Sequence, residues 1–191
     1  AIARWKPRYV LLVGIAAGFE ENEANLGDVL VSEQIVDYEL QKIVDVSKWA
    51  ALVGWFLGRR KPSEEYRFSV HRSDVRLQNA ALNFLGDGWN DLIAIARPTH
   101  GKPNRLPGPM ATGDKVVQRR TLVKALLDRW PKLIGLEMEA GGVASACFQA
   151  ASRPGFFMIR GVSDLADEKK GTAGVRKWRK YASDVAASYA I

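Results

Sequence analysis

The chain has 191 residues, of which 47% are apolar and 26% are charged. This composition is typical of a globular domain with a substantial core, and it excludes collagen-like and disordered chains. The net charge of +7 would attract anionic ligands. The basic residues fall in short clusters without interleaved aromatic residues, so nucleic acid is not an expected partner.

The apolar segments and the single cysteine indicate in which cellular compartment the chain is expected. The longest strongly apolar segment, Trp49 to Gly58, is far shorter than the roughly 20 residues that cross a bilayer, so no membrane partner is expected. The first residues lack the long apolar region of a signal peptide. Cys147 is the only cysteine, which excludes an internal disulfide and favours a reducing, cytoplasmic location. It falls in a run of small residues, where we expect a buried, inert thiol.

Two strands are predicted near the start of the chain. Tyr9 to Val13 is a continuous apolar run of β-prone residues, typical of a strand buried on both faces. It leads into Gly14 to Gly18, where the backbone could approach a ligand or simply turn. The GxGxxG spacing of dinucleotide-binding proteins is absent. A turn at Leu26 to Asp28 precedes the second strand, Val29 to Val36.

The middle of the chain gives weaker signals. Trp49 to Gly58 is either a short helix or a subunit contact. Apolar residues at helical spacing predict a helix from Val75 to Phe84, and Asp91 to Ala96 is a strand candidate. The run from Arg97 to Pro109 contains several prolines and glycines and is expected to be a loop, either a lid or a connector.

The last third of the chain alternates helices and strands. The predicted elements are a helix from Thr121 to Trp130, a strand from Lys132 to Leu136, a helix from Ala140 to Ala151, a strand from Phe156 to Val162 and a helix from about Val175 to Tyr189. The middle three form a βαβ unit, which should be right-handed and parallel, so that both strand ends open on one rim of the sheet. We therefore expect a single α/β domain over residues 1–191, with a mixed, largely parallel sheet flanked by helices.

Carboxylates gather at this predicted rim. Glu137 and Glu139 follow the first strand of the unit, and Asp164 follows the second strand, 25 positions after Glu139. We expect the two glutamates to have different roles. Other charged residues expected near the rim are Asp114, Asp167 and Arg160.

Such a group of acids suits the cleavage of a glycosidic bond. A carboxyl group in a partly dry crevice can act as a general acid near neutral pH. An ionised carboxylate can bind vicinal sugar hydroxyls and stabilise positive charge on the sugar ring, as an oxocarbenium-like transition state requires. The alternative is that these acids cap helices, which would explain any one of them more easily than all of them together.

Five segments together resemble the purine nucleoside phosphorylase and uridine phosphorylase superfamily. They occur in the family's order, and they are Gly14 to Phe19, Leu26 to Val29, Thr112 to Val116, Glu137 to Ala140 and Ile159 to Asp167. The likeness is strongest to its nucleosidase branch, the methylthioadenosine/S-adenosylhomocysteine nucleosidases. The tail after Asp167 is also similar to nucleosidase effector domains of signalling proteins.

The resemblance implies a role for each matching position. Glu139 would hold two sugar hydroxyls, and Asp164 would give a proton or a hydrogen bond to the five-membered ring of a purine, so that the base leaves neutral. Glu137 would also belong to the substrate-binding positions. The other implied contacts are Met138 against the sugar, Ser163 orienting Asp164, Val116 and Val117 at the base, and Ala16 and Ala17 beside the sugar.

Two departures from the family matter. Ile15 stands where the family often has serine or threonine, which favours water over phosphate as the nucleophile. The family's first strands, and in the nucleosidases a glutamate that activates water, would precede Tyr9 and are not in this sequence. We therefore expect the carboxyl-side portion of the family domain. Glu20, Glu21 and Glu23 are expected to form a solvated loop rather than to supply that base.

The sequence thus predicts hydrolysis of the N-glycosidic bond of a purine nucleoside or nucleotide, with Asp164 as acid and Glu139 as sugar clamp, once the N-terminal part is supplied. No cofactor or metal is expected, because His71 and His100 are isolated. The alternatives are a phosphate-dependent phosphorylase, a non-catalytic purine nucleotide-binding or assembly module, and a mere fragment of a gene product. The chain should form a homo-oligomer or belong to a larger protein.

Overall fold

The computed structural model describes residues 1–38, 41–42, 65–66, 69–84, 86, 88–113, 120–166 and 173–191. The helices are α1 (Ile2–Trp5), α3 (Val75–Asn83), α4 (Arg120–Leu127), α5 (Ala140–Gln149) and α6 (Ala173–Ala190), with the 3₁₀ helices η1 (Glu20–Asn22) and η2 (Gly88–Leu92). The strands are β1 (Tyr9–Gly18), β2 (Val29–Asp37), β3 (Gln41–Lys42), β4 (Glu65–Tyr66), β5 (Ser69–Arg72), β6 (Arg105–Thr112), β7 (Gly135–Glu137) and β8 (Gly155–Asp164). The predicted segment Trp49 to Gly58 lies outside the described residues.

The central sheet is mixed and closes on itself. Its strand order is β5-β2-β6-β7-β1-β8, and a further pairing of β2 with β8 makes it barrel-like. The long pairings, β1 with β8 and β2 with β6, are parallel, whereas β2 runs antiparallel to β5 and β8. A single α/β domain with a mixed sheet flanked by helices is therefore confirmed. The closure of the sheet was not part of the prediction.

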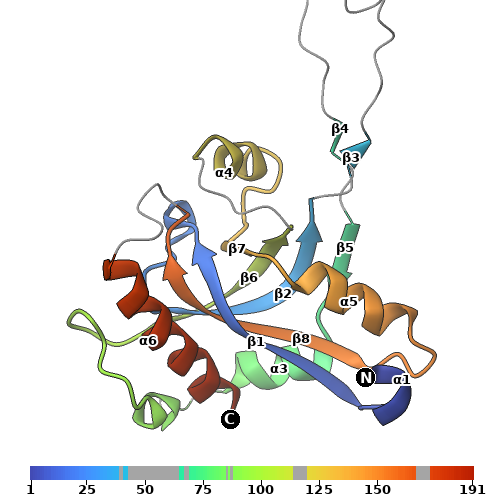
Figure 1. Ribbon diagram of the computed structural model, residues 1–191, viewed down its shortest axis with the longest axis horizontal. Coiled ribbons are helices and arrows are strands. Elements are labelled where there is room, and N and C mark those ends of the chain that lie inside the picture. Colours follow the sequence, from blue (N-terminus) through green and yellow to red (C-terminus); the bar gives the residue numbers. More distant parts are fainter. Residues whose placement is uncertain are drawn as a thin grey trace, which may run out of the picture.

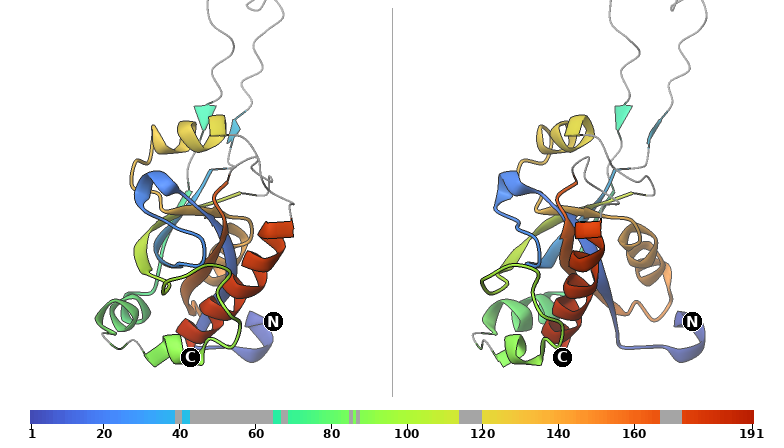
Figure 2. Two further views of the ribbon diagram at one scale, coloured as in Figure 1. Left: turned by 90° about the vertical axis from the view of Figure 1, so that its left-hand side faces the viewer. Right: turned by 60° about the vertical axis from the view of Figure 1, so that its left-hand side comes forward.

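Helices cover the sheet from several sides. Helix α6 lies against β1 and β8, α5 lies on the opposite flank beside β2 and β5, and α4 lies beyond one end of the sheet (Figures 1 and 2). The apolar residues of α6 at helical spacing, among them Trp178, Ala182 and Val185, are buried as predicted. Gly161 of β8 lets this helix come close, because a Cβ there would overlap the backbone oxygen of Ala182.

The βαβ prediction for β7, α5 and β8 is wrong in its geometry. Strands β7 and β8 do not pair, because β1 lies between them, parallel to β8 and antiparallel to β7. Strand β7 is only three residues long and pairs in parallel with β6 instead. In the observed register Ala17 pairs with both Leu136 of β7 and Asp164 of β8. The two strand ends therefore meet across Ala17 rather than on a shared parallel rim.

Strand β1 is less enclosed than its apolar sequence predicts. Leu11 is 46% exposed and Val13 is 38% exposed, whereas Ala16 and Ala17 are buried. Among the described residues, nothing pairs with β1 on the side away from β8 until β7 reaches Ala17. The strand forms as predicted, but burial on both faces is wrong for its first half.

The strand predicted at Asp91 to Ala96 is absent. Helix η2 continues to Leu92, and the next residues are irregular. Ile93 packs on the apolar side of α6, and the backbone N–H of Ile95 donates to the carboxylate of Asp184 in that helix at 2.7 Å. The segment is therefore held beside α6 by Ile93 and by this backbone hydrogen bond, while Leu92 and Ile95 stay exposed.

The loop predicted from Arg97 to Pro109 ends early, because β6 already begins at Arg105. Within the part of the chain that the structure describes, strand β6 pairs only with β2 until Met110, where β7 joins it. The backbone oxygen of Pro109 accepts from Ile134 on the side away from β2, so the N–H that proline lacks is not needed by the β2 ladder. The prolines that suggested a loop are therefore tolerated in a strand. None of the described helices is long and apolar enough to span a membrane.

Candidate active site

A cavity of about 220 Å³ lies where β1, β7 and β8 end. It is lined by all the predicted site positions that fall within the described residues, namely Ala16, Ala17, Glu137, Met138, Glu139, Ser163 and Asp164. Three further residues, Ile15, Leu136 and Arg179, also line it. Glu139 and Asp164, 25 positions apart in the sequence, thus face the same space.

The sheet register explains this convergence. Ala17 sits between Leu136 and Asp164 in neighbouring strands, which brings the ends of β7 and β8 to the same point. Ala16 and Ala17 have small side chains, so the backbone of β1 forms a wall of the cavity without filling it. The small residues of the predicted ligand-approach segment therefore lie where a ligand could contact them.

Glu137 is buried and caps the start of α5. It is only 4% exposed, and its carboxylate accepts hydrogen bonds from the backbone N–H groups of Glu139 and Ala140, each at 3.0 Å. These groups stand at the start of α5, where backbone N–H groups have no partner within the helix. A carboxylate at this position is further stabilised by the helix dipole. The capping interpretation therefore fits Glu137.

Arg160 links the two glutamates. It lies in β8, is 4% exposed, and its Nη2 donates to the Oε2 atoms of both Glu137 and Glu139, the second at 2.6 Å. Gly14 leaves room for the guanidinium, because a Cβ there would overlap Nη1 of Arg160. A buried cation requires such partners. The side chain of Glu139 remains 60% exposed, so one guanidinium holds a buried acid and an accessible one.

Asp164 is held by its immediate neighbours. It is 5% exposed, and its carboxylate accepts from the hydroxyl of Ser163 at 3.1 Å and from the backbone N–H of Ala166 at 3.3 Å. The same hydroxyl lies 3.4 Å from the backbone oxygen of Ala16. Ser163 thus ties Asp164 to the strand that forms the cavity wall.

The remaining predicted positions lie elsewhere or outside the described residues. Val116 and Val117, expected at the base, and Asp114 and Asp167, expected at the rim, lie outside the described part of the chain. Asp28, from one of the recognised motifs, is fully buried and accepts from the backbone N–H groups of Asn25 and Asn104, which joins two loops away from the cavity.

The acidic segment after β1 does not reach the cavity. Glu20, Glu21 and Glu23 are exposed, as expected of a solvated loop, and do not line it. Within the described residues, no group of three or more histidine, cysteine, aspartate or glutamate side chains could hold a metal ion.

Two residues were not singled out for the site from the sequence. Arg160 was expected only near the rim, yet a charged residue inside an otherwise apolar strand signals a buried ion pair. Arg179 follows the buried Trp178 in α6, and its place beside the cavity depends on how that helix packs. No pattern in the sequence could have placed it there.

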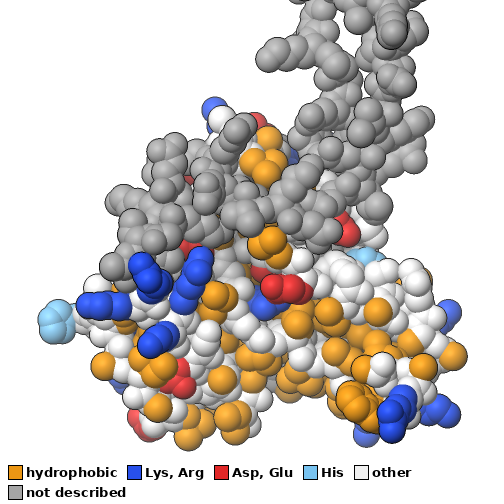
Figure 3. All heavy atoms as spheres, viewed as in Figure 1, with side chains coloured by type: hydrophobic (Ala, Val, Ile, Leu, Met, Phe, Trp, Pro, Cys, Tyr) orange, Lys and Arg blue, Asp and Glu red, His pale blue; other side chains and the backbone are white. Residues whose placement is uncertain are grey.

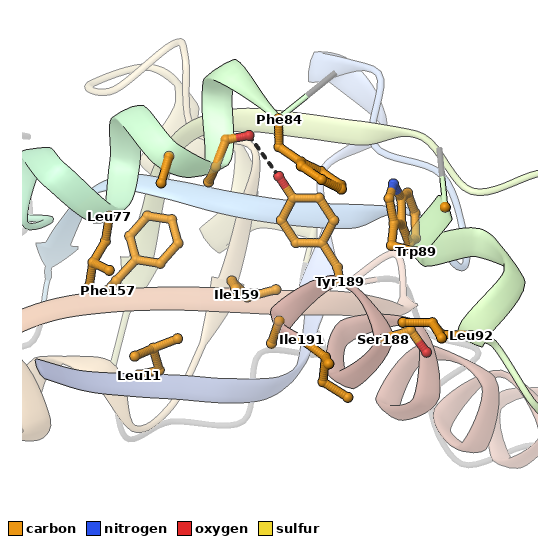
Figure 4. Close-up of a pocket in the computed structure, with 14 residues that line it drawn as sticks. Leu11, Leu77, Phe84, Trp89, Leu92, Phe157, Ile159, Ser188, Tyr189 and Ile191 are labelled. Carbon is orange, nitrogen blue, oxygen red and sulfur yellow. Dashed lines mark hydrogen bonds between the residues drawn. The ribbon is translucent and has the colours of Figure 1, made fainter. Parts of the chain in front are cut away.

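A second cavity, of about 450 Å³, lies at the other end of β1 (Figure 4). Its wall is mostly apolar and includes Leu11, Phe84, Phe157 and Ile191. The hydroxyl of Tyr189 donates to the backbone oxygen of Ala81 at 3.0 Å. Among the described residues, no acidic or basic side chain lines this cavity, so they offer it no group for acid–base chemistry.

Comparison with known proteins identifies the family of the chain. The chain belongs to the phosphorylase superfamily, whose family model matches residues 1–190. It is 27% identical over 171 residues to a 5′-methylthioadenosine/S-adenosylhomocysteine nucleosidase of Marinomonas sp. (strain MWYL1), which covers 88% of this chain and 61% of that protein.

Two further proteins are similar to the chain, one in sequence and one in fold. It is 28% identical over 204 residues to a death domain-containing ATP nucleosidase of Amphimedon queenslandica, with 98% of this chain and 33% of that protein covered. The solved nucleosidase of Neisseria meningitidis, in complex with methylthio-immucillin-A, has the same fold, with a TM-score of 0.70 at 22% identity over 99% of this chain and 70% of that chain. The chain therefore spans less than two thirds of the length of the curated relatives it matches.

Proposed function

We propose that this chain forms most of a nucleosidase domain that hydrolyses the N-glycosidic bond of a purine nucleoside or nucleotide. The observation that carries the proposal is that Glu139 and Asp164 line one cavity beside the backbone of Ala16 and Ala17. Membership of the phosphorylase superfamily and similarity to nucleosidases over most of the chain support it.

The two acids would act on the two halves of the substrate. Glu139 is 60% exposed and is held by Arg160, so its carboxylate can accept hydrogen bonds from vicinal sugar hydroxyls and stabilise positive charge on the ring. Asp164 would give a proton to a ring nitrogen of the purine as the bond between sugar and base breaks and its electron pair moves to the base. Water would then form the new bond to the sugar carbon and release a proton.

Water is favoured over phosphate as the nucleophile by one side chain. Ile15 lines the cavity where the family resemblance leads us to expect a hydroxyl group. An apolar side chain offers no hydrogen bond to a phosphate ion, whose oxygen atoms need donors. Phosphorolysis is the second candidate reaction. It would require other residues of the cavity to donate hydrogen bonds to the phosphate ion.

The test is release of free adenine by the chain, assayed together with the N-terminal part of the domain that the family would supply. Adenosine and adenosine monophosphate are incubated with the chain with and without inorganic phosphate, and the base and the sugar product are separated by chromatography. We expect adenine and the free sugar without phosphate. Strict dependence on phosphate would contradict hydrolysis, and a tight complex that never turns over would favour a non-catalytic purine-binding module.

The cellular setting of this activity is also a proposal. The single thiol, Cys147, is buried, which suits a protein that works in the reducing cytoplasm. The exposed apolar side chains of β1, Leu11 and Val13, suit a chain that is covered by a partner subunit or by further parts of a larger protein.

A further inference from the structure

We propose that Arg179 binds a phosphate group at the mouth of the cavity, and that the ligand carrying it is a purine nucleotide rather than a nucleoside. This inference rests on the proposed function, because it concerns the ligand of the same cavity. A free phosphate ion could bind at the same position, so the experiment below compares a nucleotide with inorganic phosphate.

The packing of α6 fixes the position of Arg179. Ala182 of this helix packs directly against Gly161 of β8. Arg179 comes three residues before Ala182, about 4.5 Å along the helix axis. Asp164 comes three residues after Gly161 along the strand, and both Arg179 and Asp164 line the cavity. The contact between α6 and β8 therefore places Arg179 on the same side of the cavity as Asp164.

Arg179 is available for a ligand. Its residue is exposed, and no described carboxylate forms an ion pair with it. Arg160, the other arginine near the acids, already donates to Glu137 and Glu139. Within the described cavity lining, Arg179 is thus the one cation whose charge is not used by a neighbouring acid.

The surroundings favour an anion. Lys and Arg side chains gather over the first half of α6, where Arg176, Lys177, Arg179 and Lys180 are all exposed (Figure 3). A planar guanidinium can donate two parallel hydrogen bonds to phosphate oxygens, and it is well suited to recognise them. By contrast, an uncharged nucleoside has no group that would pair with this cation. The cavity is therefore lined by Glu139 for the sugar, Asp164 for the base and Arg179 for a phosphate group.

The test compares three ligands on the full chain by isothermal titration calorimetry: adenosine, adenosine monophosphate and inorganic phosphate. Arg179→Ala should weaken binding of the monophosphate by about tenfold or more, because a hydrogen bond to a charged group is lost, and should leave adenosine binding unchanged. Lys177→Ala removes the same charge from the same helix without touching the cavity and is the matched control. Arg179→Lys should recover only part of the affinity.

The outcomes separate this inference from the proposed function. If adenosine binds and is cleaved but Arg179→Ala leaves monophosphate binding unchanged, Arg179 is no phosphate ligand and only the inference fails. If no purine compound binds at all, the proposed function itself fails. If Arg179→Ala weakens the binding of inorganic phosphate but not of the monophosphate, Arg179 is a phosphate ligand and the inference of a nucleotide is wrong. Phosphorolysis then replaces hydrolysis as the proposed reaction.

Discussion

Replacing Glu137 with glutamine should destabilise the protein far more than the same change at Glu139, although both acids contact the same guanidinium. The side chains of Glu137 and Arg160 are 1% and 5% exposed, so the substitution leaves a buried cation without its buried anion. Breaking a buried pair by removing one partner costs about 3–5 kcal/mol. The side chain of Glu139 is 60% exposed, and exposed pairs contribute about 0–1 kcal/mol.

The assay is equilibrium unfolding of the full chain in urea, followed by circular dichroism. Glu137→Gln should lower the free energy of unfolding by about 3 kcal/mol or more, with an unchanged dependence on urea. Glu139→Gln should change it by less than about 1 kcal/mol but should weaken adenosine binding, since the amide loses the charge that holds the sugar hydroxyls. Equal and small effects of the two substitutions on stability would refute the division between a structural and a ligand-facing acid.

Three further outcomes test separate parts of the structure. Asp164→Asn should reduce release of adenine by about a hundredfold or more while purine binding changes little, measured by base release and calorimetry; unchanged turnover would exclude Asp164 as the acid. Gly161→Ala should lower the free energy of unfolding by about 1–3 kcal/mol, because its Cβ would overlap the backbone of Ala182, whereas Gly142→Ala, in an open position of α5, should raise it slightly. Burial raises the pKa of the Cys147 thiol, so iodoacetamide should label it slowly in the native chain and quickly in urea; fast native labelling would contradict its burial.

The elements that the sequence could predict are those in which local pattern and tertiary packing agree. Continuous apolar runs predicted β2 and β8, and helical spacing of apolar residues predicted α3 and α6. The strand prediction for Asp91 to Ala96 failed because a short apolar run can also stay largely exposed, with only Ile93 partly buried against α6. The strand at Arg105 to Thr112 was hidden because prolines are allowed at an edge, which a sequence does not reveal.

The candidate site shows the same division. The difference between the buried Glu137 and the accessible Glu139 does not come from strand alternation, because residues two apart on a strand share a face. It follows from the end of β7 at Glu137, which leaves Glu139 at the start of α5. The route by which Glu139 and Asp164 meet was predicted wrongly, because strand order is set by long-range pairing of β1 with both partners. Arg179 could not be predicted, since its position depends on how a distant helix packs on the sheet.

A crystal structure of the full chain with a non-hydrolysable adenosine analogue would show whether one cavity receives both halves of a purine nucleoside. We predict the sugar hydroxyls within hydrogen-bond distance of the Glu139 carboxylate and a nitrogen of the purine five-membered ring at Asp164. An analogue bound with neither acid in contact, or bound only in the apolar cavity beside Leu11, would contradict the proposed function.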